Sequence, residues 1–192
     1  MPIATAMPDL KDRPARERIL LAAHDLFYRE GIRATGIDRV IAEADVAKLT
    51  FYRHFPSKND LVLAFLDHRH ERWMAWFNEA LARHRPSSGN ALAALVPTVA
   101  EWLRDEQFRG CAFLNAVGEL GGTLPEVVAT CHRHKQEMTA TIAKLLPASR
   151  QRTRQANAIA IAVDGAITHA QFEPDAKALL KALDDLLRPF LQ

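Results

Sequence analysis

The sequence of 192 residues lacks the features that mark several protein classes. Its two cysteines, Cys111 and Cys131, form no CxxC pair and no disulfide framework, so we expect a reducing compartment. No apolar run is long enough for a secretory signal or a membrane span. Sustained alternation of polar and apolar residues is also missing, so no strand is predicted. The chain is therefore expected to be a helical, cytoplasmic protein with no membrane partner.

A strong charge of one sign is missing as well. The formal net charge is +2 at pH 7, and 48% of the residues are hydrophobic, which is enough for a core in one large or two small domains. Overall charge does not indicate a nucleic-acid partner, so any basic surface must be local. The sequence contains no GxSxG, no phosphate-binding loop and no HExxH. It predicts no catalytic residue and no cofactor, and an all-helical enzyme is only a remote alternative.

What the chain does have is helical spacing. Apolar residues recur every three or four positions from Pro14 until Gly31, which predicts a first helix. Thr35 followed by Asp38 is the pattern of a capping box at the start of a second, short helix. Residues 1–13 precede both predicted helices, show no periodicity and are interpreted as a flexible arm.

A third helix is predicted over residues 46–55, after a tight break at Asp45. Its apolar anchors are Val46, Phe51 and Phe55, and its other side carries polar and basic residues. Two short helices joined by a tight turn, the second with exposed hydrogen-bond donors, describe a helix-turn-helix that reads DNA.

Six more helices complete an all-α protein of about nine helices. A second capping box at 57–60 opens a long helix that ends near Arg83, and a loop covers 85–90. Pro97 is expected to kink the helix that follows. The remaining predicted helices cover roughly 92–105, 108–119, 125–146, 150–171 and 174–191.

The segment from Arg18 to Leu61 resembles the DNA-binding region of the TetR family of transcriptional regulators. The matching elements are Leu26-Phe27, Gly31, Thr35, Ala44-x-Val46, Thr50-x-Tyr52-x-His54-Phe55, and Lys58 followed by Leu61. The resemblance implies an N-terminal arm and three-helix helix-turn-helix domain over 1–57, and a larger effector-binding and dimerisation domain over 58–192. It also implies a homodimer on a palindromic operator in double-stranded DNA, most often a repressor that a small hydrophobic effector releases.

Carried over position by position, the resemblance implies which side chains meet DNA. Base contacts are expected from Lys48, Leu49 and Thr50, and phosphate contacts from Thr35, Tyr52, Arg53, His54 and Lys58. Arg53 points outward and suits either role. Tyr52, His54 and Lys58 have a structural alternative as core cover or ordinary surface groups.

The sequence departs from the family pattern at three positions of the predicted helix-turn-helix. Asp45 stands where the family usually has glycine, and aspartate tolerates the left-handed conformation better than most residues. Ala47 and Leu49 replace the commoner serine and glycine. These changes leave the operator sequence open.

The last two helices are expected to form the dimer interface. The first of them is apolar almost all round between Ala156 and Ile167, so one face needs a partner. We expect a four-helix interface between two copies, and the alternative is internal core of a monomer. The predicted interface residues are Ile159, Val163, Ile167, Leu179, Leu183 and Leu187.

Aromatic and aliphatic residues of the C-terminal part are candidates for an effector pocket. They suit a hydrophobic ligand, or a cationic one if Asp164 or Glu119 is unpaired. The alternative is plain core packing. The candidate residues are Phe65, Trp76, Phe77, Trp102, Phe113, Leu114, Asn115, Glu119, Met138, Asp164 and His169.

A metal-responsive or thiol-responsive regulator is the alternative function. Cys131 and His134 are spaced to share one helical face, but no second ligand pair accompanies them. Cys111 is either a redox trigger or a buried, inert thiol.

Overall fold

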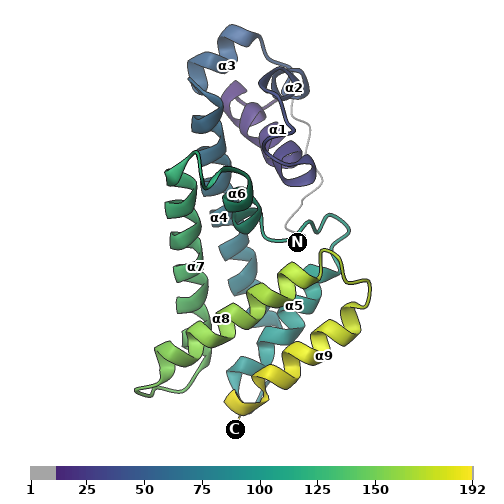
Figure 1. Ribbon diagram of the computed structural model, residues 1–192, viewed down its shortest axis with the longest axis vertical. Coiled ribbons are helices and arrows are strands. Elements are labelled where there is room, and N and C mark those ends of the chain that lie inside the picture. Colours follow the sequence, from purple (N-terminus) through teal and green to yellow (C-terminus); the bar gives the residue numbers. More distant parts are fainter. Residues whose placement is uncertain (1–11, 192) are drawn as a thin grey trace. The chain divides into compact units, whose positions relative to one another are not determined.

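The computed structural model describes residues 12–191, in which nine α-helices and no strand are found (Figure 1). The predicted all-α class is therefore confirmed. These residues form two compact units, a first unit of 12–71 and 112–131 and a second unit of 72–111 and 132–191. Residues 1–11 of the predicted arm lie outside the described residues.

The first unit is built on helix α1. It contains α1 (Ala15–Glu30), α2 (Ile37–Glu43), α3 (Lys48–His54), the start of α4 (Lys58–Arg83), α6 (Ala112–Leu120) and the start of α7 (Pro125–Leu145). The predicted apolar stripe of α1 is buried, and α1, α2 and α3 all contact one another. Phe27 of α1 meets Phe65 of α4 edge-on, with ring centroids 5.5 Å apart. The two short helices thus rest on a common core.

Helix α3 is shorter than the predicted 46–55. Ala47, at ψ 147°, is extended and forms the N-cap, and Phe55, at ψ 97°, is extended at the other end. Pro56 explains the second boundary, because a proline disfavours the helical conformation in the residue before it.

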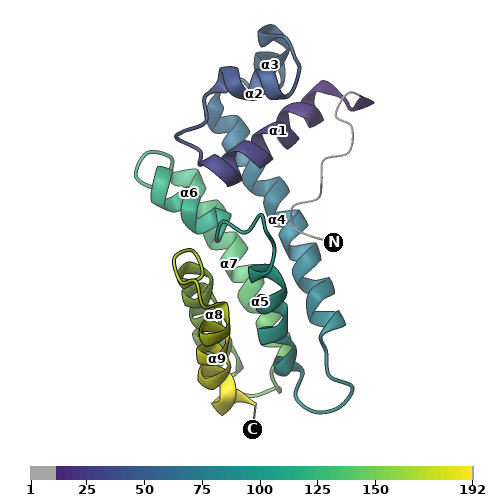
Figure 2. The same cartoon turned by 90° about the vertical axis from the view of Figure 1, so that its right-hand side faces the viewer.

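The second unit contains the rest of α4 and α7, the 3-10 turn η2 (Ala91–Ala94), α5 (Leu95–Leu103), α8 (Arg152–His169), α9 (Ala176–Leu187) and the turn η3 (Arg188–Phe190). Helices α8 and α9 run side by side, and both contact α5 (Figure 2). An aromatic cluster fills part of this core: Trp73 stacks on Phe77 at 4.6 Å and meets Trp102 edge-on at 5.5 Å.

One sequence-based expectation needs correction. Pro97 does not kink a helix; it lies in the first turn of α5, directly after η2, where its missing N–H is tolerated. The compact units divide inside α4, after Glu71, and the start of α4, α6 and the start of α7 belong to the same unit as the first three helices. The functional boundary expected between 57 and 58 stays a prediction. No helix within 12–191 is long and apolar enough to cross a membrane.

Candidate nucleic-acid interface

The polar side of α3 is held outward by two phenylalanines on its opposite side. Phe51 and Phe55 are buried, and their ring centroids lie 6.3 Å apart. The guanidinium carbon of Arg16 lies 5.2 Å from the centroid of the Phe55 ring. Helix α3 has 7 residues and its N-cap, Ala47, makes no side-chain cap. A helix this short is not stable alone, so packing on α1 and α2 fixes its direction.

The three predicted base-contact residues lie in the first turn of α3. Leu49 is 81% exposed, Lys48 is exposed and Thr50 is half-buried. Lys48 Nζ lies 3.1 Å from Asp38 Oδ1 of α2. The hydrogen bond and charge of Asp38 raise the pKa of Lys48 above the ordinary lysine value. Both partners are exposed, so DNA can compete for this lysine at little cost.

The predicted phosphate contacts fall into two groups. Tyr52 and Arg53 are exposed, and the Tyr52 ring meets Phe51 edge-on at 5.2 Å. His54 is half-buried. Lys58 is half-buried, and its Nζ donates to the backbone oxygen of Ile32 at 2.6 Å. Burial lowers the pKa of Lys58, although Glu119 opposes the shift. Lys58 therefore has a structural role beside any phosphate contact.

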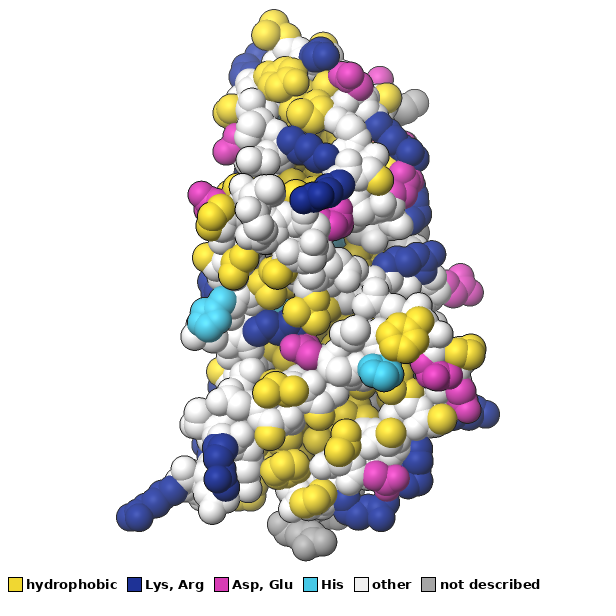
Figure 3. Space-filling view, in the orientation of Figure 1, with side chains coloured by type: hydrophobic (Ala, Val, Ile, Leu, Met, Phe, Trp, Pro, Cys, Tyr) yellow, Lys and Arg dark blue, Asp and Glu magenta, His cyan; other side chains and the backbone are white. Residues whose placement is uncertain are grey.

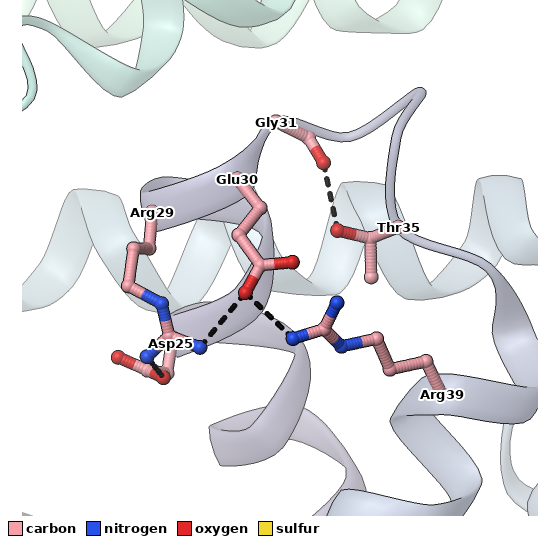
Figure 4. A network of polar contacts seen from close by, with 6 residues as sticks. All are labelled: Asp25, Arg29, Glu30, Gly31, Thr35 and Arg39. Carbon is pink, nitrogen blue, oxygen red and sulfur yellow. Dashed lines mark hydrogen bonds and ion pairs between the residues drawn. The ribbon is translucent and has the colours of Figure 1, made fainter.

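Thr35 does not have the predicted role of N-cap. It is fully buried, and its hydroxyl donates to the backbone oxygen of Gly31 at 2.8 Å (Figure 4). Gly36 is the N-cap of α2 and no side chain caps it, so the predicted capping box with Asp38 is wrong. The hydroxyl of Thr35 closes the loop of residues 31–36, the α1–α2 loop, and the phosphate contact expected from the N–H groups at this helix start stays a prediction.

An ion-pair network joins the end of α1 to α2 (Figure 4). The Glu30 carboxylate accepts from Arg29 at 2.9 Å and from Arg39 of α2 at 2.8 Å, and Asp25 accepts from Arg29 at 2.6 Å. Hydrogen bonding to Glu30 and the charge of Asp25 raise the pKa of Arg29. Exposed pairs of this kind contribute only about 0.2–1 kcal/mol each. Their effect is to favour one orientation of α2 on α1.

The turn between α2 and α3 has the predicted conformation. Asp45 has a φ of +49°, and among residues 12–191 it is the one non-glycine residue with a positive φ. Aspartate is among the few residues that visit this region readily. Arg18 Nη1 of α1 lies 4.0 Å from the Asp45 carboxylate, which supports the turn from below.

A further contact, from α6, was not predicted. The Glu119 carboxylate accepts the backbone N–H of Ile32 at 3.1 Å and that of Arg33 at 2.7 Å. Gly31, at the start of the α1–α2 loop, has a φ of +93°, a backbone conformation in which a residue with a side chain would be strained. Glu119 was expected in an effector pocket, but it binds the α1–α2 loop. Nothing local in the sequence signals a contact between residues 87 positions apart.

The predicted effector-pocket residues are mostly packed within their own units. In the first unit Phe65 and Phe113 are buried, while Leu114 and Asn115 are half-buried. In the second unit the buried residues are Trp76, Phe77, Trp102 and Met138. Within each unit, these side chains fit the alternative of plain core packing.

The polar candidates of that pocket are engaged or exposed. Asp164 Oδ1 lies 2.5 Å from Lys135 Nζ, so Asp164 is paired with a lysine of its own chain. His169 is exposed on the surface, where its ring centroid lies 5.0 Å from that of Phe172.

The residues predicted for the dimer interface lie mostly inside the chain's own second unit. Five of them are buried in the chain's own second unit, and Leu179 is half-buried. They form the inner side of α8 and α9, which fits the alternative of internal core. The buried ones are Ile159, Val163, Ile167, Leu183 and Leu187. The exposed large hydrophobic side chains of this region are instead Ile161, Phe172 and Leu186.

The residues of the metal and thiol alternatives are buried. Cys111 and Cys131 are both buried and neither is part of a disulfide, and the His134 ring packs edge-on against Trp73 at 4.9 Å. Across residues 12–191, no group of three or more His, Cys, Asp or Glu side chains is placed to hold a metal ion.

Comparison with known proteins gives the family. Residues 19–65 match the sequence profile described as bacterial regulatory proteins, tetR family. The crystal structure of a TetR-family transcriptional regulator from Streptomyces coelicolor is 32% identical, with a TM-score of 0.80 over 93% of this chain and 90% of that one. The three-helix site described above is thus a helix-turn-helix DNA-binding domain. The chain belongs to the TetR family of transcriptional regulators, whose members bind DNA and dimerise.

Two curated relatives cover most of the chain as well. A helix-turn-helix transcriptional regulator encoded in the lacX 3′ region of Lactococcus lactis is 25% identical over 93% of this chain and 94% of its own length. The transcriptional activator FasR of Mycolicibacterium smegmatis is 29% identical over 79% of this chain and 70% of its own. Both of these relatives are described as regulators of transcription.

Proposed function

We propose that the protein is a ligand-responsive repressor that binds a palindromic operator as a homodimer and is released by a small molecule. The observation that supports operator reading best is the outward side of α3. It presents Lys48, Leu49, Tyr52 and Arg53 to solvent while Phe51 and Phe55 fix the helix from behind. This is the arrangement that a short helix needs to enter a major groove.

Within this proposal, each exposed side chain has a distinct task. Lys48 donates to a guanine, Leu49 contacts a thymine methyl and Thr50 lies beside them at the base edges. Tyr52, Arg53 and His54 contact phosphates, which set the register of the helix and supply most of the salt-dependent affinity. Lys58 adds positive charge while it holds the α1–α2 loop.

A dimer is needed because one α3 offers few contacts. The two copies of α3 must reach major grooves about 34 Å apart, one helical turn of DNA. The outer side of α8 and α9 supports an interface, since Ile161 is 73% exposed and Leu186 is 61% exposed. Hydrophobic side chains are spread over this face (Figure 3). Burying them against a second copy would remove an apolar surface that a monomer leaves in water.

A mobility-shift titration on DNA from the region upstream of the gene tests operator binding. It should be run at about 50 and 200 mM salt, because phosphate contacts make affinity fall steeply with salt. The variant Tyr52→Phe removes one phenolic hydroxyl and keeps the ring on Phe51, and Arg53→Gln removes one charge. Each should weaken binding to all sequences alike, whereas Lys48→Ala should change which sequence is preferred.

The matched control is Lys177→Gln, which removes one exposed charge from α9. If Arg53→Gln and Lys177→Gln bind alike and Lys48→Ala keeps the sequence preference, α3 does not read DNA. The direction of regulation is measured with a reporter gene behind the same operator. Because the relative FasR is an activator, increased transcription on binding would replace repression in the proposal.

A further inference from the structure

A groove of about 650 Å³ lies between α7 and α8 in the second unit. The two helices meet there near the loop that joins them (Figure 1). Its residues on α7 are His132, Lys135, Gln136, Thr139, Ala140, Ala143 and Lys144, and those on α8 are Arg152, Thr153, Ala156 and Asn157. None of them belongs to the predicted effector pocket. A volume of this size accommodates an ordinary small-molecule ligand.

The chemistry of the lining is that of an amphiphile site. The α7 residues recur every three or four positions, so they form one continuous side of that helix. Ala140, which is exposed, and Ala143, which is half-buried, give the groove a small apolar surface, because alanine leaves room where a larger side chain would fill the groove; Ala156 is fully buried. Threonine, asparagine and glutamine side chains add neutral hydrogen-bonding groups around it.

The charge of the lining has one sign. Lys135, Lys144 and Arg152 line the groove, and none of its lining residues carries a carboxylate. Arg152 Nε donates to the backbone oxygen of Ala143 at 2.5 Å, which holds the guanidinium at the groove and leaves its two terminal nitrogens as donors. Lys144 is exposed in the last turn of α7.

Lys135 is the one cation of the lining with an acidic partner. Its Nζ lies 2.5 Å from Asp164 Oδ1, which neutralises part of its charge. Burial by itself lowers the pKa of Lys135, but Cys111 and Asp164 more than offset this and raise it above the ordinary lysine value. The positive charge left for a ligand therefore resides mainly on Lys144 and Arg152.

We propose that the α7–α8 groove binds a small organic anion with an apolar body, such as an aromatic carboxylate or sulfonate. The anionic group lies between Lys144 and Arg152, where a guanidinium can donate two hydrogen bonds to it. The apolar body covers Ala140 and Ala143. This names a ligand class for the proposed repressor, and it rests on that function only for the regulatory consequence of binding.

The test compares two fluorescent probes with the same ring system, added to the full chain in its own oligomeric state. 1-Anilinonaphthalene-8-sulfonate is anionic, and N-phenyl-1-naphthylamine is the neutral molecule without the sulfonate. Lys144→Gln should weaken binding of the sulfonate about threefold, the effect of one exposed cation, and leave the neutral probe unchanged. Ala140→Trp, which fills an exposed position of the lining, should weaken both probes more than tenfold.

Lys177→Gln is the matched control, because it removes the same charge from α9, outside the lining. Saturable binding of the sulfonate that responds to Lys144→Gln and to Ala140→Trp, but not to Lys177→Gln, supports the proposal. A sulfonate affinity that neither groove variant changes overturns it. Sulfonate binding that appears only after dilution to monomers also overturns it, in favour of a second copy of the chain as the occupant.

These measurements need no DNA. If the unmutated protein binds its operator but not the sulfonate, only the proposed anion site in the groove is refuted. If the unmutated protein binds the sulfonate but not the operator, only the proposed function is refuted.

Discussion

Replacing Glu119 by glutamine tests whether α6 holds the DNA-binding helices in place. The native carboxylate accepts two backbone N–H groups, those of Ile32 at 3.1 Å and Arg33 at 2.7 Å. Glutamine has nearly the same shape, but one of its two terminal atoms is an N–H₂ donor. That group would face a backbone donor, so one hydrogen bond is lost and a repulsive donor pair is created.

The size of the effect follows from the surroundings of the two bonds. Hydrogen bonds to a charged group contribute about 1.5–3 kcal/mol when buried, but the bond to Arg33 is exposed and the bond to Ile32 is only partly buried. We therefore expect Glu119→Gln to cost about 1–2 kcal/mol, at the low end of this range. For a chain of this length that lowers the thermal midpoint by about 2–8 °C.

The assay is thermal unfolding followed by circular dichroism, with operator binding measured on the same preparations. Glu71→Gln is the control, because Glu71 is an exposed glutamate of the first unit, in α4. Glu119→Gln should also weaken operator binding, since the α1–α2 loop leads directly into α2. Equal thermal midpoints for the two variants would refute the reasoning, because the carboxylate would then contribute nothing that an amide does not.

Two further predictions concern other carboxylates. Asp38→Asn removes the partner of Lys48 and a negative charge near the DNA-facing side. The affinity for DNA, measured by a mobility-shift titration, should therefore rise about three- to tenfold on operator and unrelated DNA alike. An unchanged affinity would show that the pair does not restrain Lys48. Burial by itself raises the pKa of Glu101, but hydrogen bonds from His84, Trp76 and Arg83 outweigh it and lower that pKa. The stability from Glu101 is thus fully present above the ordinary glutamate pKa and is lost as the pH falls through the lowered value, so Glu101→Gln should flatten the acid side of the free energy of unfolding measured against pH.

Local sequence patterns predicted the helices well, but they did not predict which side of each helix is buried and which is exposed. The spacing of apolar residues gave α1 and α4 because each stripe is long and ends at a glycine, a proline or a capping residue. It failed for α8, where nearly every side is apolar: Ile159 and Ile161 look alike in the sequence, yet the first is buried and the second is 73% exposed. Only packing against α5 and α9 decides between them.

In the candidate site, too, some residues could be predicted from the sequence and others could not. The α3 residues could be assigned because a short motif fixes their positions, and Asp45 because turn geometry limits the residues allowed at positive φ. The capping role of Thr35 was mistaken because α2 begins one residue later than expected, with Gly36 as its N-cap, and the Thr35 hydroxyl donates to the backbone oxygen of Gly31. The role of Glu119 could not be predicted, since its partners are backbone groups that carry no side-chain signature.

The α1–α2 loop is where the contacts that position α2 and α3 converge. Thr35 binds its carbonyl at Gly31, Lys58 binds its carbonyl at Ile32, and Glu119 binds two of its N–H groups. Lys58 begins α4, which continues past residue 71 into the second unit, and Glu119 lies in α6, which follows the second unit's Cys111 closely in the chain. In the proposed ligand-responsive repressor, a ligand that shifts α4 or α6 would act, through one lysine and one glutamate, on the segment that leads into the helix-turn-helix. Such a proposed shift would need a coupling of about 1–3 kcal/mol. The bonds made by Glu119 are of that size, so under this proposal they would be strong enough to hold the loop in the free protein and weak enough for a ligand to release it.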